Sequence, residues 1–203
     1  SIDNRFIQLL NKIFCAAWLN ILWFLCCIPV FTIGTSTTAL YYVSFKLVRN
    51  EEGNITKQFF TAFRSNFKKA TLIWLPLLGL GILFGIDGYV LYHIRLENVF
   101  WTLCGAVLIC AGVVYLIVLL NVFPLFARFE NTIPATFKNA LVMGLRYLFC
   151  SILMAVVYFV IYYVIINIFT PFVVFGQGLG ALICSWLILP ILERLENNKD
   201  DVL

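Results

Sequence analysis

Few side chains in this sequence have the type and spacing that catalysis or metal binding requires. The chain has a single histidine, His93, so a histidine-based metal cluster is excluded. The signatures of serine hydrolases, zinc proteases and P-loop ATPases, which are G-x-S-x-G, H-E-x-x-H and G-x-x-x-x-G-K-[ST], do not occur. We therefore expect a protein that is not an enzyme and holds no cofactor and no metal ion.

The seven cysteines offer no alternative chemistry. They lie in or beside apolar stretches, at Cys15, Cys26, Cys27, Cys104, Cys110, Cys150 and Cys184. Cys26 and Cys27 are direct neighbours, whereas a metal-binding or redox pair has the spacing C-x-x-C. A thiol in apolar surroundings behaves as a small hydrophobic group. We expect these cysteines to be packing residues without disulfides.

The remaining candidates are four polar side chains inside apolar stretches: Asp87, Asn121, Asn167 and Gln177. A carboxylate in hydrocarbon is costly and usually faces a partner or a cavity. Arg95 is near enough along a helix to pair with Asp87, and the amides can form hydrogen bonds between helices. We favour these structural roles, and a polar pathway for a solute is the alternative.

Four long apolar runs carry these residues, at 72–92, 99–123, 148–169 and 171–192. About 20 helical residues cross the roughly 30 Å of a bilayer's hydrocarbon. The chain is 63% hydrophobic and 12% charged, and a soluble domain carries about twice that charged fraction. The sequence thus predicts an integral membrane protein whose first partner is the lipid bilayer. The basic residues that give the chain its net charge of +4 flank the spans, so no nucleic-acid partner is expected.

The basic residues also predict an orientation. They concentrate at 46–69 and again between the second and third runs, and such segments normally stay in the cytoplasm. We therefore expect 93–98 to lie outside and the C-terminal tail, 193–203, to be cytoplasmic. The implied location is a bacterial plasma membrane, crossed several times.

The first fifty residues allow two interpretations, because Pro29 and Gly34 interrupt the apolar pattern. We favour a helical hairpin, with one helix over about 5–27, a turn at 29–34 followed by an N-cap, and a shorter helix over about 36–49. The hairpin keeps Arg5 and Lys12 on the basic side and gives six crossings. The alternative is a single span that ends near Ile33, which gives five.

Amphipathic helices are predicted before two of the spans, at 56–70 and 133–148. In the first, Phe59, Phe63 and Phe67 recur every four residues and make one apolar face, beside Lys68 and Lys69. These five residues are our candidate partner contacts. The predicted fold is an all-α polytopic bundle with one integral domain, 1–203, divided into 1–50, 55–123, 124–192 and the tail.

Glycines recur at near-helical spacing in two spans. Gly79, Gly81, Gly85 and Gly88 lie in the first apolar run, and Gly176, Gly178 and Gly180 lie in the last. Because small residues let helices approach closely in lipid, we expect both sets to mark helix contacts.

The N-terminal third also resembles a known family. The similarity lies in LNILWFLCCIPVFTIGTSTTALYY at 19–42, KLVRNEEG at 46–53, Phe59-Phe60 and NFKKAT at 66–71, and it continues weakly at 123–129 and 138–141. These segments resemble the YesL family, small bacterial membrane proteins classed as a domain of unknown function. The resemblance covers residues 3 to about 75 and offers no catalytic residues to transfer.

The resemblance implies a Gram-positive plasma membrane and a genomic association with carbohydrate ABC importers and glycan-degrading enzymes. We therefore expect an accessory membrane subunit of an ABC-type carbohydrate importer, structural or regulatory in role, with sugar permease subunits as partners. The E-A-A-type loop by which importer permeases bind their ATPases is missing, which argues against a core permease. The alternative is a stand-alone channel or carrier for a small solute.

Overall fold

The computed structural model describes residues 2–51, 53–93, 99–129, 131–168 and 170–197, and its regular structure there is helical throughout. The elements in chain order are α1 (Ile2–Cys26), η1 (Val30–Thr32), α2 (Ile33–Val48), α3 (Ile55–His93), α4 (Val99–Arg128), α5 (Ile133–Arg146), α6 (Leu148–Asn167), η2 (Thr170–Phe172) and α7 (Val173–Asn197). The prediction of an all-α helical bundle is confirmed.

Five segments of the described chain are long and apolar enough to cross a membrane. They are Ile7–Cys26 in α1, the whole of α3, α4 and α6, and Phe175–Asn197 in α7. The four predicted apolar runs fall in α3, α4, α6 and α7. The helices are therefore those of a multi-pass membrane protein, and the side on which each end lies stays a prediction.

The N-terminal segment folds as the two helices of the predicted hairpin, and the turn between them overlaps the predicted turn at 29–34. It occupies 27–32, where Pro29 precedes the short helix η1. The hydroxyl of Thr32 donates to the carbonyl oxygen of Pro29 at 2.6 Å. Helix α2 begins at Ile33, about three residues earlier than predicted, so Gly34 lies inside the helix and not in the turn.

Gly34 instead lets α2 approach α3. A Cβ atom at Gly34 would lie 2.9 Å from the carbonyl oxygen of Ala70 and would overlap the side chain of Trp74. One residue further on, the hydroxyl of Thr35 lies 3.2 Å from that of Thr71. Helix α2 is almost entirely buried and packs against α1, α3, α4 and α7. This 16-residue helix is the centre of the bundle and is not among the candidate spans.

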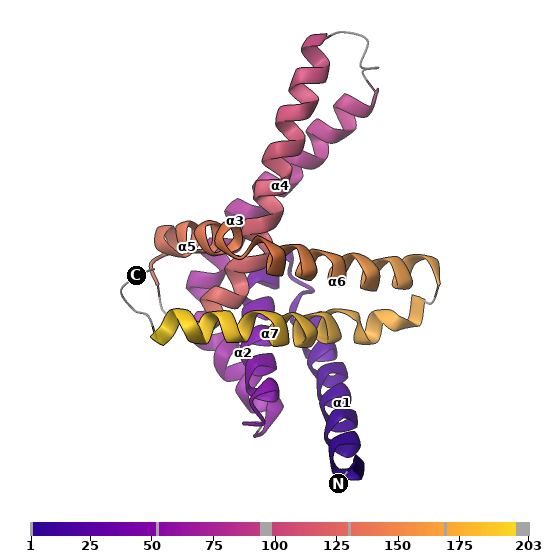
Figure 1. Ribbon diagram of the computed structural model, residues 1–203, viewed down its shortest axis with the longest axis vertical. Helices are drawn as coiled ribbons and strands as arrows, with labels where there is room; N and C mark the ends of the chain where they lie inside the picture. The colour runs from indigo at the N-terminus through magenta and orange to yellow at the C-terminus, as the bar shows by residue number, and fades with distance from the viewer. Residues whose placement is uncertain (1, 52, 94–98, 130, 169, 198–203) are drawn as a thin grey trace.

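The long helices form two hairpins that diverge. In Figure 1, α3 and α4 extend together as an arm beyond the rest of the molecule, and the α6–α7 hairpin runs across their direction. The apolar runs predict successive crossings of one bilayer, and nothing in their pattern predicts this divergence. In this arrangement, at most one of the two hairpins stands perpendicular to a flat membrane.

The glycine pattern is confirmed in α7 and largely wrong in α3. A Cβ at Gly176 would lie 2.7 Å from the Ile165 side chain of α6, and one at Gly180 would lie 2.8 Å from Tyr158. In α3 only Gly81 has a close neighbour, the Tyr115 hydroxyl at 2.7 Å. The other three glycines of that helix have nothing within 4 Å of such an atom: Gly79, Gly85 and Gly88.

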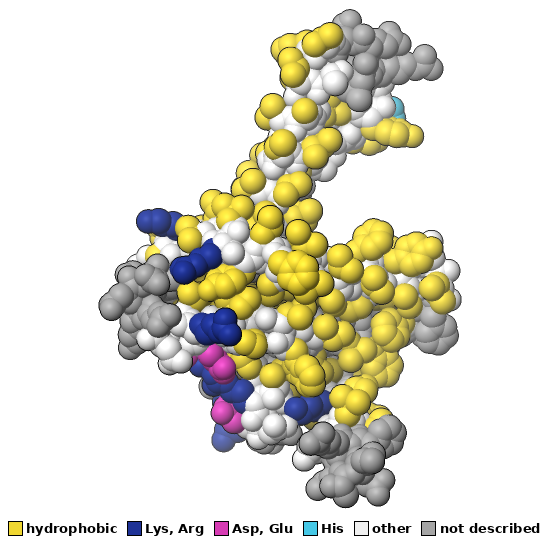
Figure 2. Space-filling model, in the orientation of Figure 1, with side chains coloured by type: hydrophobic (Ala, Val, Ile, Leu, Met, Phe, Trp, Pro, Cys, Tyr) yellow, Lys and Arg dark blue, Asp and Glu magenta, His cyan; other side chains and the backbone are white. Residues whose placement is uncertain are grey.

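Charge and apolar surface are segregated. On the face shown in Figure 2, most charged side chains gather on one side of the molecule, at the left, and hydrophobic side chains cover the α3–α4 arm and the α6–α7 hairpin. Arg49, Arg128, Glu193 and Glu196 place the ends of α2, α4 and α7 in that charged region. This is where the polar pockets described below are found.

Candidate functional site

The polar residues predicted inside the spans do not come together. Asn121 is buried, and its amide donates to the carbonyl oxygen of Ile117 at 2.8 Å and to the hydroxyl of Ser151 at 2.9 Å. Ser151 in turn donates to the carbonyl oxygen of Gly144 at 3.2 Å. Asn121 therefore fastens α4 to α5 and α6, which is the structural role that we favoured.

Two of the other candidates lie at the outer parts of the hairpins. The amide of Asn167 donates to the carbonyl oxygen of Tyr163 in its own helix, at 3.1 Å. Asp87 is exposed on the α3–α4 arm, and its predicted partner Arg95 lies outside the described residues. Asn121, Asn167 and Asp87 thus occupy separate regions, and together they trace no continuous polar path through the described helices.

Gln177 lines an aromatic cavity of about 400 Å³ between α2, α4 and the α6–α7 hairpin. Its side-chain oxygen accepts a hydrogen bond from the hydroxyl of Tyr162 at 2.9 Å. The hydroxyls of Tyr41 and Tyr158, which also line it, lie 2.8 Å apart. Tryptophan, leucine, isoleucine and phenylalanine side chains make most of the remaining wall, and no charged group is among its described lining residues. Such a cavity suits an uncharged occupant.

The aromatic face predicted as a partner contact is turned mainly into the chain's own core. Phe59 is completely buried, and Phe63 and Phe67 are half-buried. The three rings follow one another, with centroids 6.3 Å and then 5.7 Å apart. Phe59 is therefore covered by the chain's own helices, because α3 packs against α1, α2 and α5 and this packing removes apolar area from solvent. Lys68 and Lys69 remain exposed.

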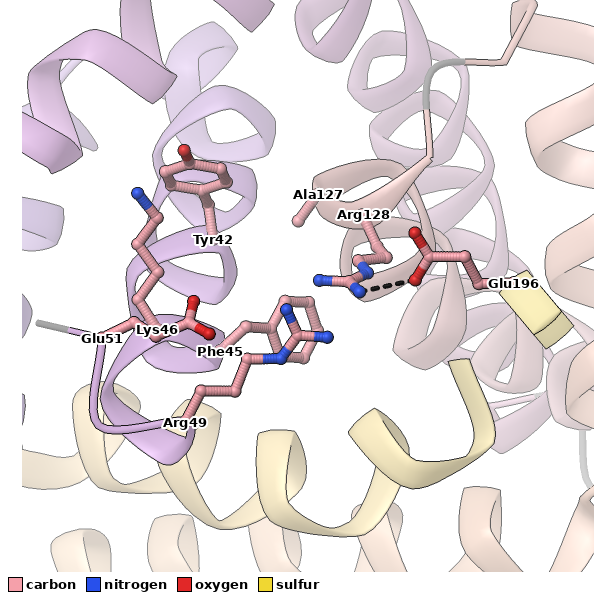
Figure 3. A pocket seen from close by; sticks show the side chains of 8 residues that line it. All are labelled: Tyr42, Phe45, Lys46, Arg49, Glu51, Ala127, Arg128 and Glu196. Carbon is pink, nitrogen blue, oxygen red and sulfur yellow. Dashed lines mark hydrogen bonds and ion pairs between the residues drawn. The ribbon is translucent and has the colours of Figure 1, made fainter. Parts of the chain in front are cut away.

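A charged pocket of about 290 Å³ lies where α2, α4 and α7 end (Figure 3). Its lining side chains are Tyr42, Phe45, Lys46, Arg49, Glu51, Ala127, Arg128 and Glu196. We refer to it as the end pocket.

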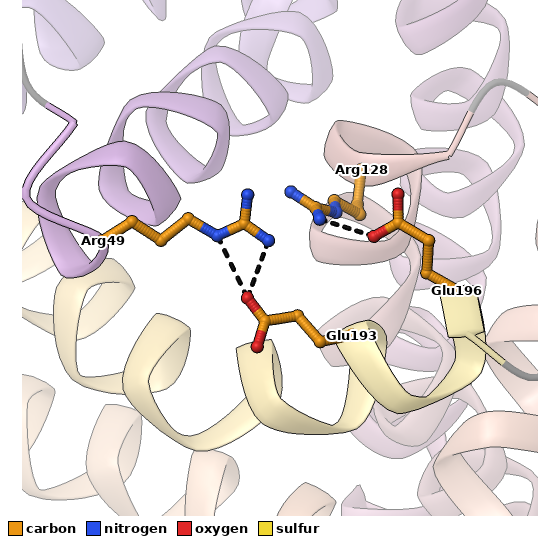
Figure 4. A network of polar contacts seen from close by, with 4 residues as sticks. All are labelled: Arg49, Arg128, Glu193 and Glu196. Atoms are coloured by element: carbon orange, nitrogen blue, oxygen red, sulfur yellow. Dashed lines mark hydrogen bonds and ion pairs between the residues drawn. The ribbon is translucent and has the colours of Figure 1, made fainter.

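Two ion pairs border the end pocket (Figure 4). The guanidinium of Arg49 donates twice to one carboxylate oxygen of Glu193, at 3.1 and 2.7 Å, and that of Arg128 donates to Glu196 at 2.5 Å. The pairs tie α2 and α4 to the last turns of α7. Because the side chains are 19% to 47% exposed, each pair contributes on the order of 1 kcal/mol or less to stability.

A second pocket, of about 340 Å³, adjoins the end pocket and shares Tyr42, Ala127 and Arg128 with it. We call it the side pocket. Its wall also includes Lys69 and a set of short polar side chains of α3: Thr61, Ser65 and Asn66. No carboxylate is among its described lining residues. The ammonium group of Lys46 lies 4.8 Å from the centre of the Tyr42 ring, at the junction of the two pockets.

Most of this site is not predicted by the sequence. From the sequence alone, Lys46, Arg49 and Arg128 are only charges that flank spans, and Glu196 is part of the tail. Arg49 and Glu193 are 144 positions apart, so no local pattern indicates that they meet. The nearest signal was the concentration of basic residues at 46–69. Among the described residues there is also no group of acidic, histidine and cysteine side chains that could hold a metal ion.

A family model described as "Protein of unknown function, DUF624" matches residues 16–88. The match runs from the middle of α1 through α2 and most of α3, and it includes the α2 residues that line both pockets and the α3 residues that line the side pocket. Over this range the chain is similar to an uncharacterised family, and the narrower YesL name stays a prediction. Comparison with curated proteins and with solved structures finds no match.

Proposed function

We propose that this protein is an accessory membrane subunit of an ABC-type carbohydrate importer, structural or regulatory in role and without catalytic chemistry of its own. The importer is suggested by the resemblance of the N-terminal third to proteins encoded beside such systems. The observation that carries the accessory role is the α3–α4 arm, which extends from the bundle with an apolar surface that the described chain leaves uncovered (Figures 1 and 2).

The surface of the arm suits another transmembrane helix. Leu80, Leu83 and Ile86 are 47% to 56% exposed, and Gly85 lies among them with open space where a Cβ would stand. In lipid, helices associate where small residues allow their backbones to approach closely. The arm therefore replaces the Phe59 face as the proposed contact with a permease subunit.

The open glycines allow a sharp test. The substitution Gly85→Leu adds a side chain where this chain has nothing within 4 Å, so the fold should tolerate it while a docked helix should not. Permease and ATPase subunits of one importer, identified by mass spectrometry, should copurify with the tagged parent protein in mild detergent. Gly85→Leu should lose them and keep the parent's melting temperature. Gly112→Leu, an equally open position on α4, is the matched control.

The corresponding test in cells measures sugar uptake. Deleting the protein should impair import of the glycan served by the neighbouring importer and leave unrelated sugars unaffected. Normal uptake of that glycan, together with no importer subunit in the purified complex, would defeat the accessory role.

A stand-alone carrier is the second candidate, and the aromatic cavity at Gln177 favours it. A cavity of about 400 Å³ with hydroxyl and amide groups on an aromatic wall is large enough for a small neutral solute. Purified protein in sealed vesicles should then transport such a solute without any partner, and Gln177→Leu should slow the flux. Partner-free vesicles that show no flux would exclude the carrier.

A further inference from the structure

We propose that the end pocket and the side pocket together form a binding site for a phosphate ester, whose charged group lies at their junction beside Tyr42, Lys69 and Arg128. The proposal is independent of the importer, because it rests only on the charge and hydrogen-bonding capacity of the described pocket walls.

The charge at the junction favours an anion. Of the cations around the two pockets, Arg49 and Arg128 are paired with the carboxylates of Glu193 and Glu196. Lys46 and Lys69 have no carboxylate partner among the described residues, and the one unpaired carboxylate of the two pockets, Glu51, lines the end pocket and not the side pocket. Within the side pocket the described lining carries two positive groups, Lys69 and Arg128, and no negative one.

The unused hydrogen-bond donors are also concentrated there. Arg128 uses only Nη2 for Glu196, which leaves its Nε and Nη1 donors available. The Tyr42 hydroxyl and the Lys69 ammonium group have no hydrogen-bond partner among the described residues. By contrast, Thr61 and Ser65 already donate to the carbonyl oxygens of Lys57 and Ala62. A phosphate oxygen accepts from arginine, lysine and phenol donors, and the arginine fork suits two oxygens at once.

The surroundings indicate an ester rather than a bare ion. Each pocket, at about 290 and 340 Å³, has the volume of a site for a small organic ligand. Phe126 and Phe129 line the side pocket next to the cationic groups, so an apolar portion of the ligand would meet apolar wall. The same chemistry can come from the headgroup of an anionic lipid or from a water-soluble phosphate ester.

The test uses purified full-length protein, stripped of lipid in detergent, and measures binding by native mass spectrometry and by thermal shift. The probes are dioleoylphosphatidylglycerol, dioleoylglycerol as the phosphate-free lipid, and glycerol phosphate as the soluble ester. We expect phosphatidylglycerol to bind more tightly than dioleoylglycerol. Competition by glycerol phosphate would assign a soluble ester as the natural source, and its failure to compete would assign a lipid.

The matched variants are Lys69→Gln and Lys68→Gln, which remove the same charge from adjacent exposed positions of α3. Only Lys69 lines the side pocket. Loss of one charge-assisted hydrogen bond should weaken phosphatidylglycerol binding about tenfold in Lys69→Gln. Lys68→Gln should bind like the parent, and Lys69→Arg should retain most of the affinity. Equal weakening by the two glutamine variants would show general surface attraction, and either that result or no weakening at all would overturn the proposal.

Discussion

The contact between α1 and α7 at Gly178 is close enough that one added methyl group should destabilise the protein. A Cβ atom built at Gly178 would overlap the carbonyl oxygen of Ala16 and would lie 3.1 Å from the Cβ of Asn20. The backbone nitrogen of Gly178 also donates to the side-chain oxygen of Asn20 at 2.9 Å. Since the obstruction is backbone, the substitution Gly178→Ala can be accommodated only if the two helices separate.

The magnitude follows from three terms. Overpacking a well-packed site costs about 1–3 kcal/mol. Separation also weakens the hydrogen bond to Asn20, which is worth about 1 kcal/mol. Alanine is favoured over glycine inside a helix by about 1 kcal/mol, which offsets part of the loss. The net destabilisation expected for Gly178→Ala is therefore about 1–3 kcal/mol, or roughly 2–12 °C in melting temperature for a chain of this size.

Thermal unfolding of the purified protein in detergent, followed by circular dichroism, measures this shift. Gly112→Ala is the control, because that glycine lies inside α4 with nothing within 4 Å of the added atom. The control should melt at or slightly above the parent temperature, as helix propensity predicts. If Gly178→Ala melts as high as Gly112→Ala, then α1 and α7 do not make the close contact and the reasoning is refuted.

Three further predictions concern two other contacts and the membrane topology. Replacing Asn121 by Leu should lower the stability by about 1 kcal/mol, because it removes the interhelical bond to Ser151, and an unchanged melting temperature would contradict that role. In a double-mutant cycle with glutamine substitutions, Arg49 and Glu193 should show a coupling below about 1 kcal/mol that decreases with added salt, whereas a larger, salt-independent coupling would mean that the pair is shielded from water. A cysteine that replaces Lys138, in an otherwise cysteine-free protein, should resist a membrane-impermeant reagent applied to intact cells, because basic segments stay in the cytoplasm. Labelling at that position would show that the topology is opposite to the predicted one.

The sequence alone determined the class of structure and most helix positions. The apolar runs are local properties of the chain, and each is long enough to require a helix in hydrocarbon, where every backbone polar group must be satisfied within its own segment. The interruption around Pro29 likewise predicted two N-terminal helices. The start of the second helix was predicted about three residues late, because glycine serves both turns and close helix contacts, and the sequence around Gly34 does not show which of the two applies.

Only the tertiary structure decided which faces meet. Phe59 and the Gly85 surface both resemble contact faces in the sequence, yet the first is buried by the chain's own helices and the second is left open. The pockets join side chains of α2, α3, α4 and α7 that are far apart along the chain. Local hydropathy and charge specify that a helix forms and that its ends are polar. The choice of neighbour depends on side-chain packing summed over the whole bundle, which a one-dimensional pattern does not contain.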